Sequence, residues 1–365
     1  MNDNKQNRHL PYDLAQMQSV PLEGKIIMTQ LRIRAWYEHF DGQVYVSFSG
    51  GKDSTVLKHI VDQMYDDVPA VFVNTGLEYP EIQQFVREIK SGKYDCFNSD
   101  VEILRPEMRF DEVVKKYGYP VISKEVAKMI KEARVAIKKG NTEYYAIQKL
   151  EGRLKNKDGE KSQFNCEKYN FLIESPFKIS NQCCDVMKKR PNHKYEKQTG
   201  RTPFIGTMAC ESRQRLAQWN RFGCNAFDKK NPSSQPLSFW TEQDIYHYIK
   251  KNNVPICPVY GEISIDDRSE DTIEGQINMI DYLGCYEPGD LLKTTGCNRT
   301  GCIFCCFGIT RDGKLNRFQK LKQTHPRQYE YCIGGGEFND EGIWQPSKQG
   351  LGLGKVLDYI GVKYE

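Results

Sequence analysis

The sequence predicts an α/β protein with a parallel sheet covered by helices on both faces. Between residues 44 and 106, short apolar runs that favour strands alternate with amphipathic runs that favour helices. A glycine pair follows the first of these strands directly, and a glycine- and cysteine-rich segment follows the α/β part. These observations predict a sheet-based core with a helical insertion and a small Cys-rich C-terminal module.

Each element of the core has its own pattern. Residues 22–40 place apolar side chains at helical spacing, whereas residues 44–48, 70–76 and 101–106 are short apolar strand-like runs. Helices are expected between them, at 54–65 and 79–91. A further helix is expected to begin with residues 112–116. A later strand is expected at 203–209 and an amphipathic helix at 240–251. Strands alternating with helices in this order are typical of a parallel sheet with right-handed crossovers.

Changes in composition suggest how the 365 residues are divided. We expect an N-terminal helical segment over 1–40, an α/β domain over 41–260 with a basic helical insertion at about 124–172, and a Cys-rich module over 261–365. From residue 124 to residue 161 eleven Lys/Arg stand against six Asp/Glu, a net +5, while the whole chain carries +4. A solvated helical surface explains this excess, and a surface that meets a polyanion is the alternative.

The termini and the cysteine count indicate a compartment. The N-terminus is polar, without the apolar core of a signal peptide, and no run approaches the roughly 20 apolar residues of a membrane span. We therefore expect a cytoplasmic protein that makes no contact with a membrane. In a reducing compartment, thirteen cysteines favour metal or catalytic sites over disulfide bonds.

The string Ser49-Gly50-Gly51-Lys52-Asp53-Ser54 lies where the first strand gives way to a helix. Free backbone N–H groups and the positive end of the helix dipole meet at such a junction, which makes it a natural phosphate site. The glycines let an anion approach the backbone, the serines supply hydroxyl groups, and the lysine can neutralise phosphate charge. The string is not a Walker motif, because no further glycine stands at the required spacing. We interpret it as a phosphate-binding turn of another type.

Three segments together resemble a known family. The string above is similar to the PP-loop of the ATP pyrophosphatase (adenine nucleotide alpha hydrolase) superfamily. Within that superfamily, NTGLEYPE at residues 74–81 resembles the D-T-G-x-x-F/Y-P-E segment of phosphoadenosine phosphosulfate (PAPS) reductases, and IGTMACESRQR at residues 205–215 resembles their G-x-x-x-x-E-S-x-x-R segment. The resemblance implies a Rossmann-like domain of the HUP type that binds an adenine nucleotide.

The resemblance also implies roles for single residues. Lys52, Asp53 and Ser54 would be the catalytic residues, acting on the phosphates of ATP or a PAPS-like nucleotide with a bound Mg²⁺. The implied nucleotide-binding residues are Ser47, Ser49, Gly50, Gly51, Lys52, Asp53, Ser54, Asn74, Thr75, Gly76, Arg213 and Arg215. The two arginines would add positive charge around a phosphate or sulfate group, and surface ion pairs are the alternative for them.

Cysteines are concentrated in two places, at Cys183-Cys184 and at Cys297, Cys302, Cys305 and Cys306. Thiolates at this density suit zinc or an iron–sulfur cluster. The first pair resembles the tandem-cysteine segment of adenylylsulfate reductases, which complete a [4Fe–4S] site with a later C-x-x-C. The expected ligands are Cys184, Cys297, Cys302 and Cys305, with Cys183 and Cys332 as alternates and zinc as the alternative to the cluster.

One departure from the reductases bears on the reaction. Their attacking cysteine lies in a C-terminal E-C-G-[IL]-H segment, which this sequence lacks. The chain more closely resembles PAPS-reductase-like proteins with C-terminal G-C-x-F-C clusters, which are related to the DndC-type enzymes of DNA phosphorothioation. The implied reaction is cleavage of ATP between the α and β phosphates, after which sulfur displaces the adenylylated oxygen.

Two alternatives to this function remain. One is a PAPS or adenylylsulfate reductase that releases sulfite, and the other is a non-catalytic nucleotide sensor or nucleic-acid-binding partner. Expected partners are an adenine nucleotide, a sulfur donor or reductant protein, a nucleic acid, and a second copy in a homo-oligomer. The basic and aromatic residues 316–332 favour nucleic-acid contact or, equally well, a packed amphipathic helix.

Overall fold

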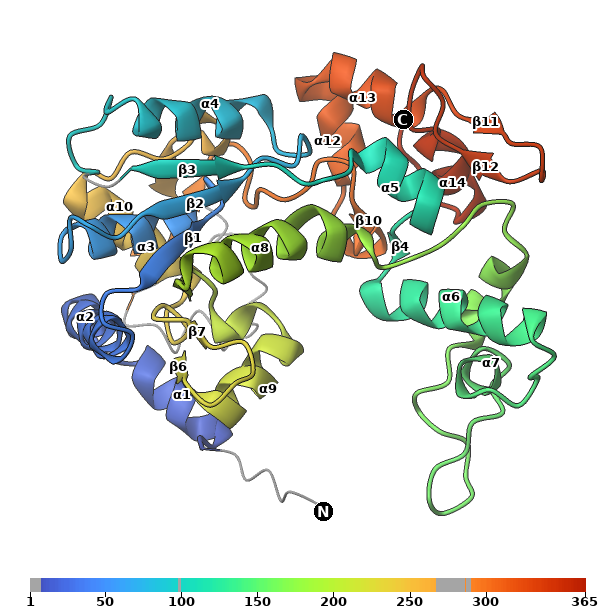
Figure 1. Ribbon diagram of the computed structural model, residues 1–365, viewed down its shortest axis with the longest axis horizontal. Helices are drawn as coiled ribbons and strands as arrows, with labels where there is room; N and C mark the ends of the chain where they lie inside the picture. Colours follow the sequence, from blue (N-terminus) through green and yellow to red (C-terminus); the bar gives the residue numbers. More distant parts are fainter. Residues whose placement is uncertain (1–7, 98–99, 267–285, 287–289) are drawn as a thin grey trace. The chain divides into compact units, whose positions relative to one another are not determined.

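The computed structural model describes residues 8–97, 100–266, 286 and 290–365, which form two compact units (Figure 1). The first unit comprises residues 1–74, 78–104 and 192–300, and the second comprises residues 75–77, 105–191 and 301–365. The chain passes between the units several times, so they cut across the boundaries expected near residues 40 and 260. Residues 261–266 and 290–300, expected in the Cys-rich module, belong to the compact unit that contains the sheet.

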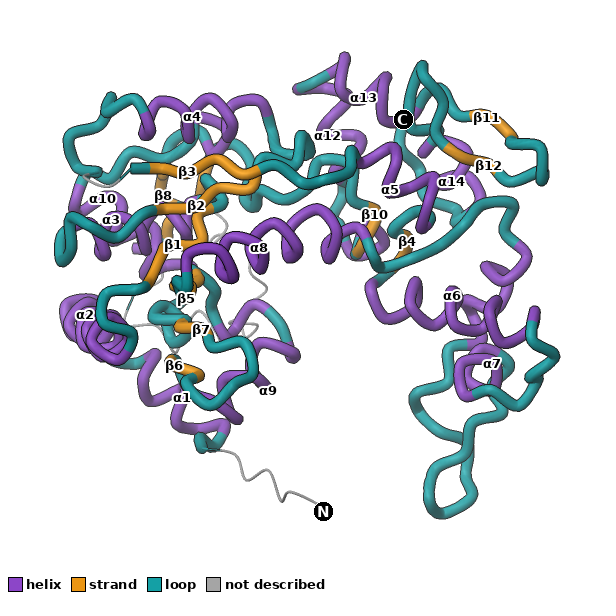
Figure 2. Tube along the Cα trace, viewed as in Figure 1, coloured by secondary structure: helices purple, strands orange, loops and turns teal. Residues whose placement is uncertain are grey.

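The first unit is organised around a six-stranded sheet with the order β3-β2-β1-β5-β7-β6 (Figure 2). Its strands are β1 (Val44–Phe48), β2 (Ala70–Val73), β3 (Val101–Leu104), β5 (Thr202–Ile205), β6 (Asn225–Ala226) and β7 (Ser233–Ser234). All neighbouring pairs are parallel except β6 with β7. In the register, Val46 pairs with Ala70 on one side and Phe204 on the other. The sheet confirms the predicted α/β class.

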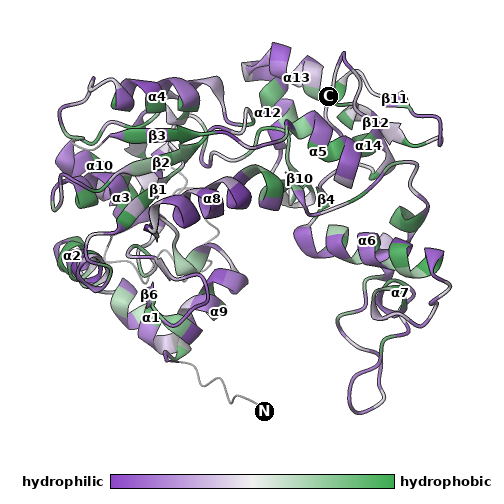
Figure 3. Cartoon of the chain, viewed as in Figure 1, coloured by the Kyte–Doolittle hydropathy of each residue, from purple (hydrophilic) through white to green (hydrophobic). Residues whose placement is uncertain are grey.

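The two faces of the central strand contact different helices. Val44, Val46 and Phe48 belong to the main apolar core, together with residues of α3 (Lys52–Asp62), α4 (Pro80–Lys90) and α10 (Glu242–Asn252). Tyr45 points to the opposite face and packs edge-on against Tyr195 of α8 (Arg190–Thr199). This alternation is the period-2 pattern of a strand that is buried on both faces. Figure 3 shows the resulting concentration of hydrophobic residues on β2 and β3.

Several further elements complete the first unit. These are α1 (Pro11–Gln18), α2 (Leu22–His39), α9 (Arg213–Phe222), the 3₁₀ helices η3 (Ala209–Glu211) and η4 (Pro258–Tyr260), and the antiparallel pair β8 (Ile263–Ile265) and β9 (Leu292–Thr294). The expected strand 203–209 ends early, at Ile205, because the chain turns at Gly206 and re-forms as η3. The expected helix 22–40 matches α2 to within one residue.

The second unit contains the insertion and the C-terminal tail. Its helices are α5 (Phe110–Tyr117), α6 (Lys124–Lys138), α7 (Tyr145–Leu150), α12 (Arg317–Thr324), α13 (Pro326–Ile333) and α14 (Leu353–Tyr359), with η1 (Glu167–Glu174), the π-helical turn η2 (Asp185–Lys189) and η7 (Ile309–Arg311). Strand β10 (Cys306–Phe307) pairs with β4 (Val121–Ile122), and β11 (Glu337–Phe338) pairs with β12 (Trp344–Gln345). Phe318, Leu321 and Tyr329 are buried, so α12 and α13 are packed amphipathic helices.

No helix among the described residues combines the length and the apolar character that crossing a membrane requires.

Candidate functional site

The glycine turn lies at the carboxyl end of β1, the strand where the sheet order reverses. The chain runs from β1 to β2 and β3 on one side, and later adds β5 on the other side of β1. Parallel α/β sheets bind ligands outside the carboxyl ends of their strands, at such a reversal. The segments after β1 and β5 therefore flank the position where the fold itself favours a ligand.

The two glycines of the turn are needed for different reasons. Gly50 has a φ of +70°, and a Cβ there would lie 2.8 Å from Cγ2 of Ile82. Gly51 has an ordinary φ of −80°, but a Cβ would lie 3.1 Å from the Thr300 hydroxyl and 3.2 Å from the Tyr260 hydroxyl. Gly50 permits the backbone conformation of the turn, and Gly51 lets the Thr300 and Tyr260 hydroxyl groups come close to the backbone of the turn.

The serines of the turn stabilise its shape. The hydroxyl oxygens of Ser49 and Ser54 lie 2.9 Å apart, and Ser54 Oγ also accepts the Ser49 N–H at 3.2 Å. Ser54 donates in turn to the Gly51 carbonyl oxygen at 2.9 Å. Ser47, also expected at the site, lies half-buried within β1 and pairs with Val71 and Ile205. The hydroxyl groups of Ser49 and Ser54 therefore stabilise the conformation in which the backbone of the turn faces the proposed ligand.

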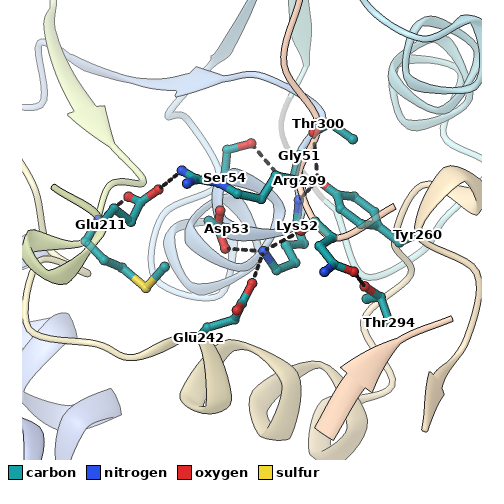
Figure 4. A network of polar contacts seen from close by, with 12 residues as sticks. Gly51, Lys52, Asp53, Ser54, Glu211, Glu242, Tyr260, Thr294, Arg299 and Thr300 are labelled. Atoms are coloured by element: carbon teal, nitrogen blue, oxygen red, sulfur yellow. Dashed lines mark hydrogen bonds and ion pairs between the residues drawn. The ribbon is translucent and has the colours of Figure 1, made fainter. Parts of the chain in front are cut away.

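Helix α3 begins immediately after the turn. Its first backbone N–H groups have no partners inside the helix, and Gly51 at the N-cap has no side chain to supply one. The Tyr260 hydroxyl accepts the N–H of Lys52 at 3.1 Å and lies 2.7 Å from the Thr300 hydroxyl (Figure 4). Burial raises the pKa of Tyr260 to about 12. The first N–H group of the helix is therefore bonded to a neutral hydroxyl group and not to a carboxylate.

Lys52 extends from this helix start into a buried position and is only 3% exposed. Its ammonium lies 3.0 Å from Glu242 Oε1 and 3.5 Å from Asp53 Oδ1. Burial opposes the charged form, but these two carboxylates outweigh it and raise the pKa of Lys52. The lysine is therefore a fixed positive charge beside the turn, in a setting where its charge is poorly screened.

The segment after β5 reaches the same helix. A Cβ on Gly206 would lie 3.0 Å from the Cα of Ser54, so only glycine allows this approach. Farther along, Glu211 forms ion pairs with Arg215 and with Arg299, the latter at 2.6 Å. Burial, followed by the nearby Arg299 guanidinium, lowers the pKa of Arg215. Two cations thus share one carboxylate beside the PP-loop.

Other predicted nucleotide-binding residues lie elsewhere. Arg213 is the first residue of α9 and its side chain is exposed. Asn74 follows β2 at the carboxyl edge of the sheet, where its side-chain amide lies 3.4 Å from Gln83 Oε1. Thr75 and Gly76 belong to the second unit. Of the expected set, the structure gathers Ser49 to Ser54 with Arg215 on the first unit.

Four cysteines line one small cavity inside the second unit. The cavity measures about 20 Å³, close to the room that one water molecule needs. Its lining is Leu77, Phe110, Pro120, Cys183, Cys184, Met187, Lys188, Cys302 and Cys305. A hydrogen bond from Cys183 is the largest cause that lowers the pKa of Cys184; burial opposes this shift, and nearby lysines assist it. The surroundings of Cys184 therefore favour its thiolate form.

The remaining cysteines are placed differently from the expected ligand set. Cys297 belongs to the first unit, where its thiol donates to the Arg299 carbonyl oxygen at 2.8 Å. Cys332 and Cys306 are fully buried in the second unit, and neither lines the cavity. Cys285 lies outside the described residues. As the described side chains stand, no three of the His, Cys, Asp and Glu type are close enough to hold a metal ion.

Sequence patterns missed several residues that surround the PP-loop. Glu242 and Tyr246 lie one turn apart in α10, for which the sequence pattern predicts an amphipathic helix and no site residue. Tyr260, Arg299 and Thr300 lie more than 200 residues after the turn. Arg299 and Thr300 lie inside the string GCNRTGC, whose cysteines favour a metal site. The polar residues between those cysteines are the feature of the sequence that indicates a second role for this segment.

This geometry defines a protein that presents a helix N-terminus and a buried lysine at the reversal point of a parallel sheet, the arrangement of a nucleotide-phosphate site. The phosphoadenosine phosphosulfate reductase domain model matches residues 43–152 and 137–306. The chain belongs to this family, within the adenine nucleotide alpha hydrolase superfamily. The family binds adenine nucleotides and consists of enzymes of the PAPS reductase/ATP pyrophosphatase type.

Curated relatives are distant. Sulfate adenylyltransferase subunit 2 of Agrobacterium fabrum is 25% identical over 227 residues, covering 60% of this chain and 58% of the relative. Phosphoadenosine 5′-phosphosulfate reductase of Proteus mirabilis is 22% identical, with coverages of 63% and 71%. Adenosine 5′-phosphosulfate reductase of Lysinibacillus sphaericus is 20% identical, with coverages of 64% and 74%. The chain spans only 58% of the Agrobacterium relative and 21% of an uncharacterised protein of Methanocaldococcus jannaschii.

Proposed function

We propose that the protein binds ATP, or a related adenylyl nucleotide, at the PP-loop and cleaves it between the α and β phosphates. The observation that carries this proposal is the buried Lys52 at the start of α3, held charged by Asp53 and Glu242 beside the glycine turn. An acceptor oxygen attacks the α-phosphorus and pyrophosphate leaves with the electron pair of the broken P–O bond. A sulfur nucleophile then attacks the acceptor atom that carries the adenylylated oxygen, and AMP leaves with that oxygen and the electron pair of the broken bond, so that sulfur takes the oxygen's place on the acceptor.

The residues of the turn would act mainly by electrostatics. Negative charge grows on the phosphate oxygens as pyrophosphate leaves, and the Lys52 ammonium and the positive end of the α3 dipole are placed to stabilise that charge. Asp53 Oδ1 is buried and accepts no hydrogen bond from the residues that the structure describes, and it lies 3.5 Å from the Lys52 ammonium. A carboxylate oxygen in this state fits a Mg²⁺ ion brought in with the nucleotide.

We propose that Cys183, Cys184, Cys302 and Cys305 hold a [4Fe–4S] cluster, with zinc as the alternative. The donor set fits either group, because all four are thiols on one cavity and one of them favours the thiolate form. The cavity is small, so the side chains would have to rearrange around either group. When bound, a cluster would supply electron transfer or sulfur handling, and zinc would supply structure alone.

The names of the Proteus and Lysinibacillus relatives favour a second candidate function, reduction of a sulfonucleotide with release of sulfite. In that reaction a thiolate attacks the sulfate sulfur of the sulfonucleotide, and the adenosine phosphate leaves with the bridging oxygen. A dithiol reductant then releases sulfite from the S-sulfonated thiol and is itself oxidised to a disulfide. The nucleotide would occupy the same turn. The two candidates differ in what leaves: pyrophosphate from ATP in the first, and sulfite from a sulfonucleotide in the second.

The test uses full-length protein purified without oxygen. Pyrophosphate release from ATP is measured with and without DNA or RNA, and sulfite release from PAPS and adenylylsulfate is measured with a dithiol reductant. We expect pyrophosphate release, and a loss of about a hundredfold in Lys52→Ala. Lys250→Ala is the matched control, because Lys250 is an exposed lysine near the end of α10. Sulfite release without pyrophosphate would support the reductase, and nucleotide binding without either product would support a sensor.

A further inference from the structure

Three consecutive residues of the cysteine-rich segment, Asn298, Arg299 and Thr300, border the PP-loop site; Figure 4 labels the last two. The Asn298 carbonyl oxygen accepts from the Lys52 ammonium at 3.4 Å. Arg299 Nη2 lies 2.6 Å from Glu211 Oε1. The Thr300 hydroxyl would lie 3.1 Å from a Cβ on Gly51. The segment 298–300 therefore forms one side of the site, opposite a turn that lies more than 240 positions earlier in the chain.

The backbone of this segment is well anchored. The Thr300 hydroxyl meets that of Tyr260, a side chain only 2% exposed that also accepts the Lys52 N–H. On the preceding side, Gly296 N–H donates to the Tyr260 carbonyl oxygen and Cys297 N–H donates to that of Val259, each at 2.9 Å. Between these anchors the Arg299 side chain is 67% exposed. A fixed backbone thus carries a guanidinium that is free to reorient.

Glu211, the present partner of Arg299, has other hydrogen-bond and ion-pair partners besides Arg299. Glu211 also pairs with Arg215 and accepts the N–H of Met208 at 3.0 Å, and its side chain is only 14% exposed. If Arg299 turned away, the carboxylate would keep two partners. An ion pair with so exposed a cation is weak, whereas a guanidinium fork binds phosphate oxygens strongly and in a fixed geometry.

We propose that Arg299 exchanges Glu211 for an anionic phosphate group of the bound nucleotide, and that Glu211 competes with that phosphate. This inference rests on the proposed nucleotide site and adds to it a cation from the cysteine-rich segment. It also gives Arg299 the role that the sequence assigned to Arg213, which is exposed at the start of α9. The class of ligand recognised is a nucleotide polyphosphate, including its pyrophosphate portion.

The experiment measures affinity for ATP with Mg²⁺, and for inorganic pyrophosphate, by calorimetry on the full chain. We expect Arg299→Ala to weaken both about tenfold or more, and Arg299→Lys to lie between it and the wild type because charge remains but the fork is lost. Arg213→Ala is the control and should stay within about twofold. Because Arg299 is exposed, thermal melts of these variants should match the wild type.

Glu211→Gln separates phosphate binding from a structural role for Arg299. Glutamine can still accept the Met208 N–H but frees both arginines, so we expect it to bind ATP as tightly as the wild type or more tightly. If Arg299 served only to hold its segment through Glu211, Arg299→Ala and Glu211→Gln would weaken binding alike, and the inference would be overturned. Unchanged binding in Arg299→Ala would overturn it as well. A wild-type protein that binds no adenine nucleotide would instead overturn the proposed function, and this inference with it.

Discussion

At the scale of single residues, the two glycines of the PP-loop perform separable tasks. Gly50 adopts a left-handed φ with Ile82 packed behind it, whereas Gly51 has an ordinary φ and the nearest neighbours of a Cβ there would be the Thr300, Ser49 and Tyr260 hydroxyl oxygens. Gly50 therefore serves the backbone conformation of the turn, and Gly51 serves the close approach of these polar groups. The two requirements can be tested apart, although the residues are adjacent.

We predict that Gly50→Ala lowers the free energy of unfolding by about 1–3 kcal/mol, because a non-glycine residue is strained at this φ and its Cβ meets Ile82. Gly51→Ala, the matched control for stability, should fold nearly as well but bind ATP more weakly. Urea unfolding and calorimetric binding on both variants check this. Equal stability of the two variants would contradict it.

A second residue-level prediction concerns His59, a buried side chain of α3. Its Nδ1 lies 2.8 Å from the Tyr248 hydroxyl, and burial, with the nearby Lys58 charge second, lowers its pKa below the ordinary 6.5. His59 therefore binds a proton more readily in the unfolded chain than in the folded chain. The free energy of unfolding is not reduced by this group above the unfolded pKa of His59, and it decreases as the pH falls through and below that pKa.

The measurement compares urea unfolding at about pH 7.5 and about pH 5.5. Wild-type protein should lose more of its free energy of unfolding over this interval than His59→Asn, which does not titrate there. Identical losses in both proteins would show that His59 titrates normally in the folded state. Other groups contribute equally to both proteins, so the difference isolates this side chain.

Sequence patterns predicted the PP-loop residues because strand, glycines, lysine and helix are contiguous. They could not predict Tyr260 or Arg299, because what places these side chains at the turn is tertiary packing across more than 200 residues. The same limit explains why the sequence could not show which of Arg213 and Arg215 lies at the site. Both stand in one matching segment, but the start of α9 turns the first outwards and leaves the second beside Glu211.

At the scale of elements, the sheet was predictable where strands are long and apolar. Strands β1, β2 and β3 fall within the expected ranges, because each is a continuous apolar run flanked by turn residues. Strands β6 and β7 have two residues each and carry no periodicity that could be read. The contact between α2 and α10 was equally invisible, since it depends on one buried ion pair far apart in sequence.

That ion pair gives an element-level prediction. Lys25 of α2 and Asp244 of α10 are fully buried, with Nζ 2.7 Å from Oδ2, and Asp244 also accepts from Thr241 and Tyr286. Lys25→Met leaves a buried carboxylate without its cation, so we expect a loss of about 3–5 kcal/mol in the free energy of unfolding. Lys251→Met is the control, because the Lys251–Glu23 pair joins the same two helices at the surface. A loss as small as the control's would show that the buried pair contributes little.

At the scale of the whole molecule, each compact unit carries its own chemical feature. The first unit contains the PP-loop and the residues around it, and the second contains four thiols on one cavity. Sequence spacing placed Cys297 with Cys302 and Cys305, because the three are close along the chain. The chain leaves the first unit at residue 300, however, and the tandem pair Cys183-Cys184 supplies two thiols in place of one.

This difference yields the final prediction, which concerns metal content. Iron, sulfide and zinc are measured in anaerobically purified protein, with absorption at about 350–450 nm, for the wild type and single Cys→Ser variants. If the four cavity thiols are the ligands, Cys184→Ser and Cys302→Ser should lose most of the bound metal. Cys297→Ser should keep it, because its thiol already donates to the Arg299 carbonyl in the other unit.

Cys297→Ser also reports on the nucleotide site, since serine can make the same donation to Arg299. We therefore expect this variant to retain both its bound metal and its affinity for ATP. In the wild type, a chelator should remove the metal and lower the thermal stability of the protein. Loss of metal in Cys297→Ser with retention in Cys183→Ser would restore the ligand set expected from sequence spacing. The second unit would then not suffice to hold the metal alone, and the segment 297–300 would serve the metal and the nucleotide together.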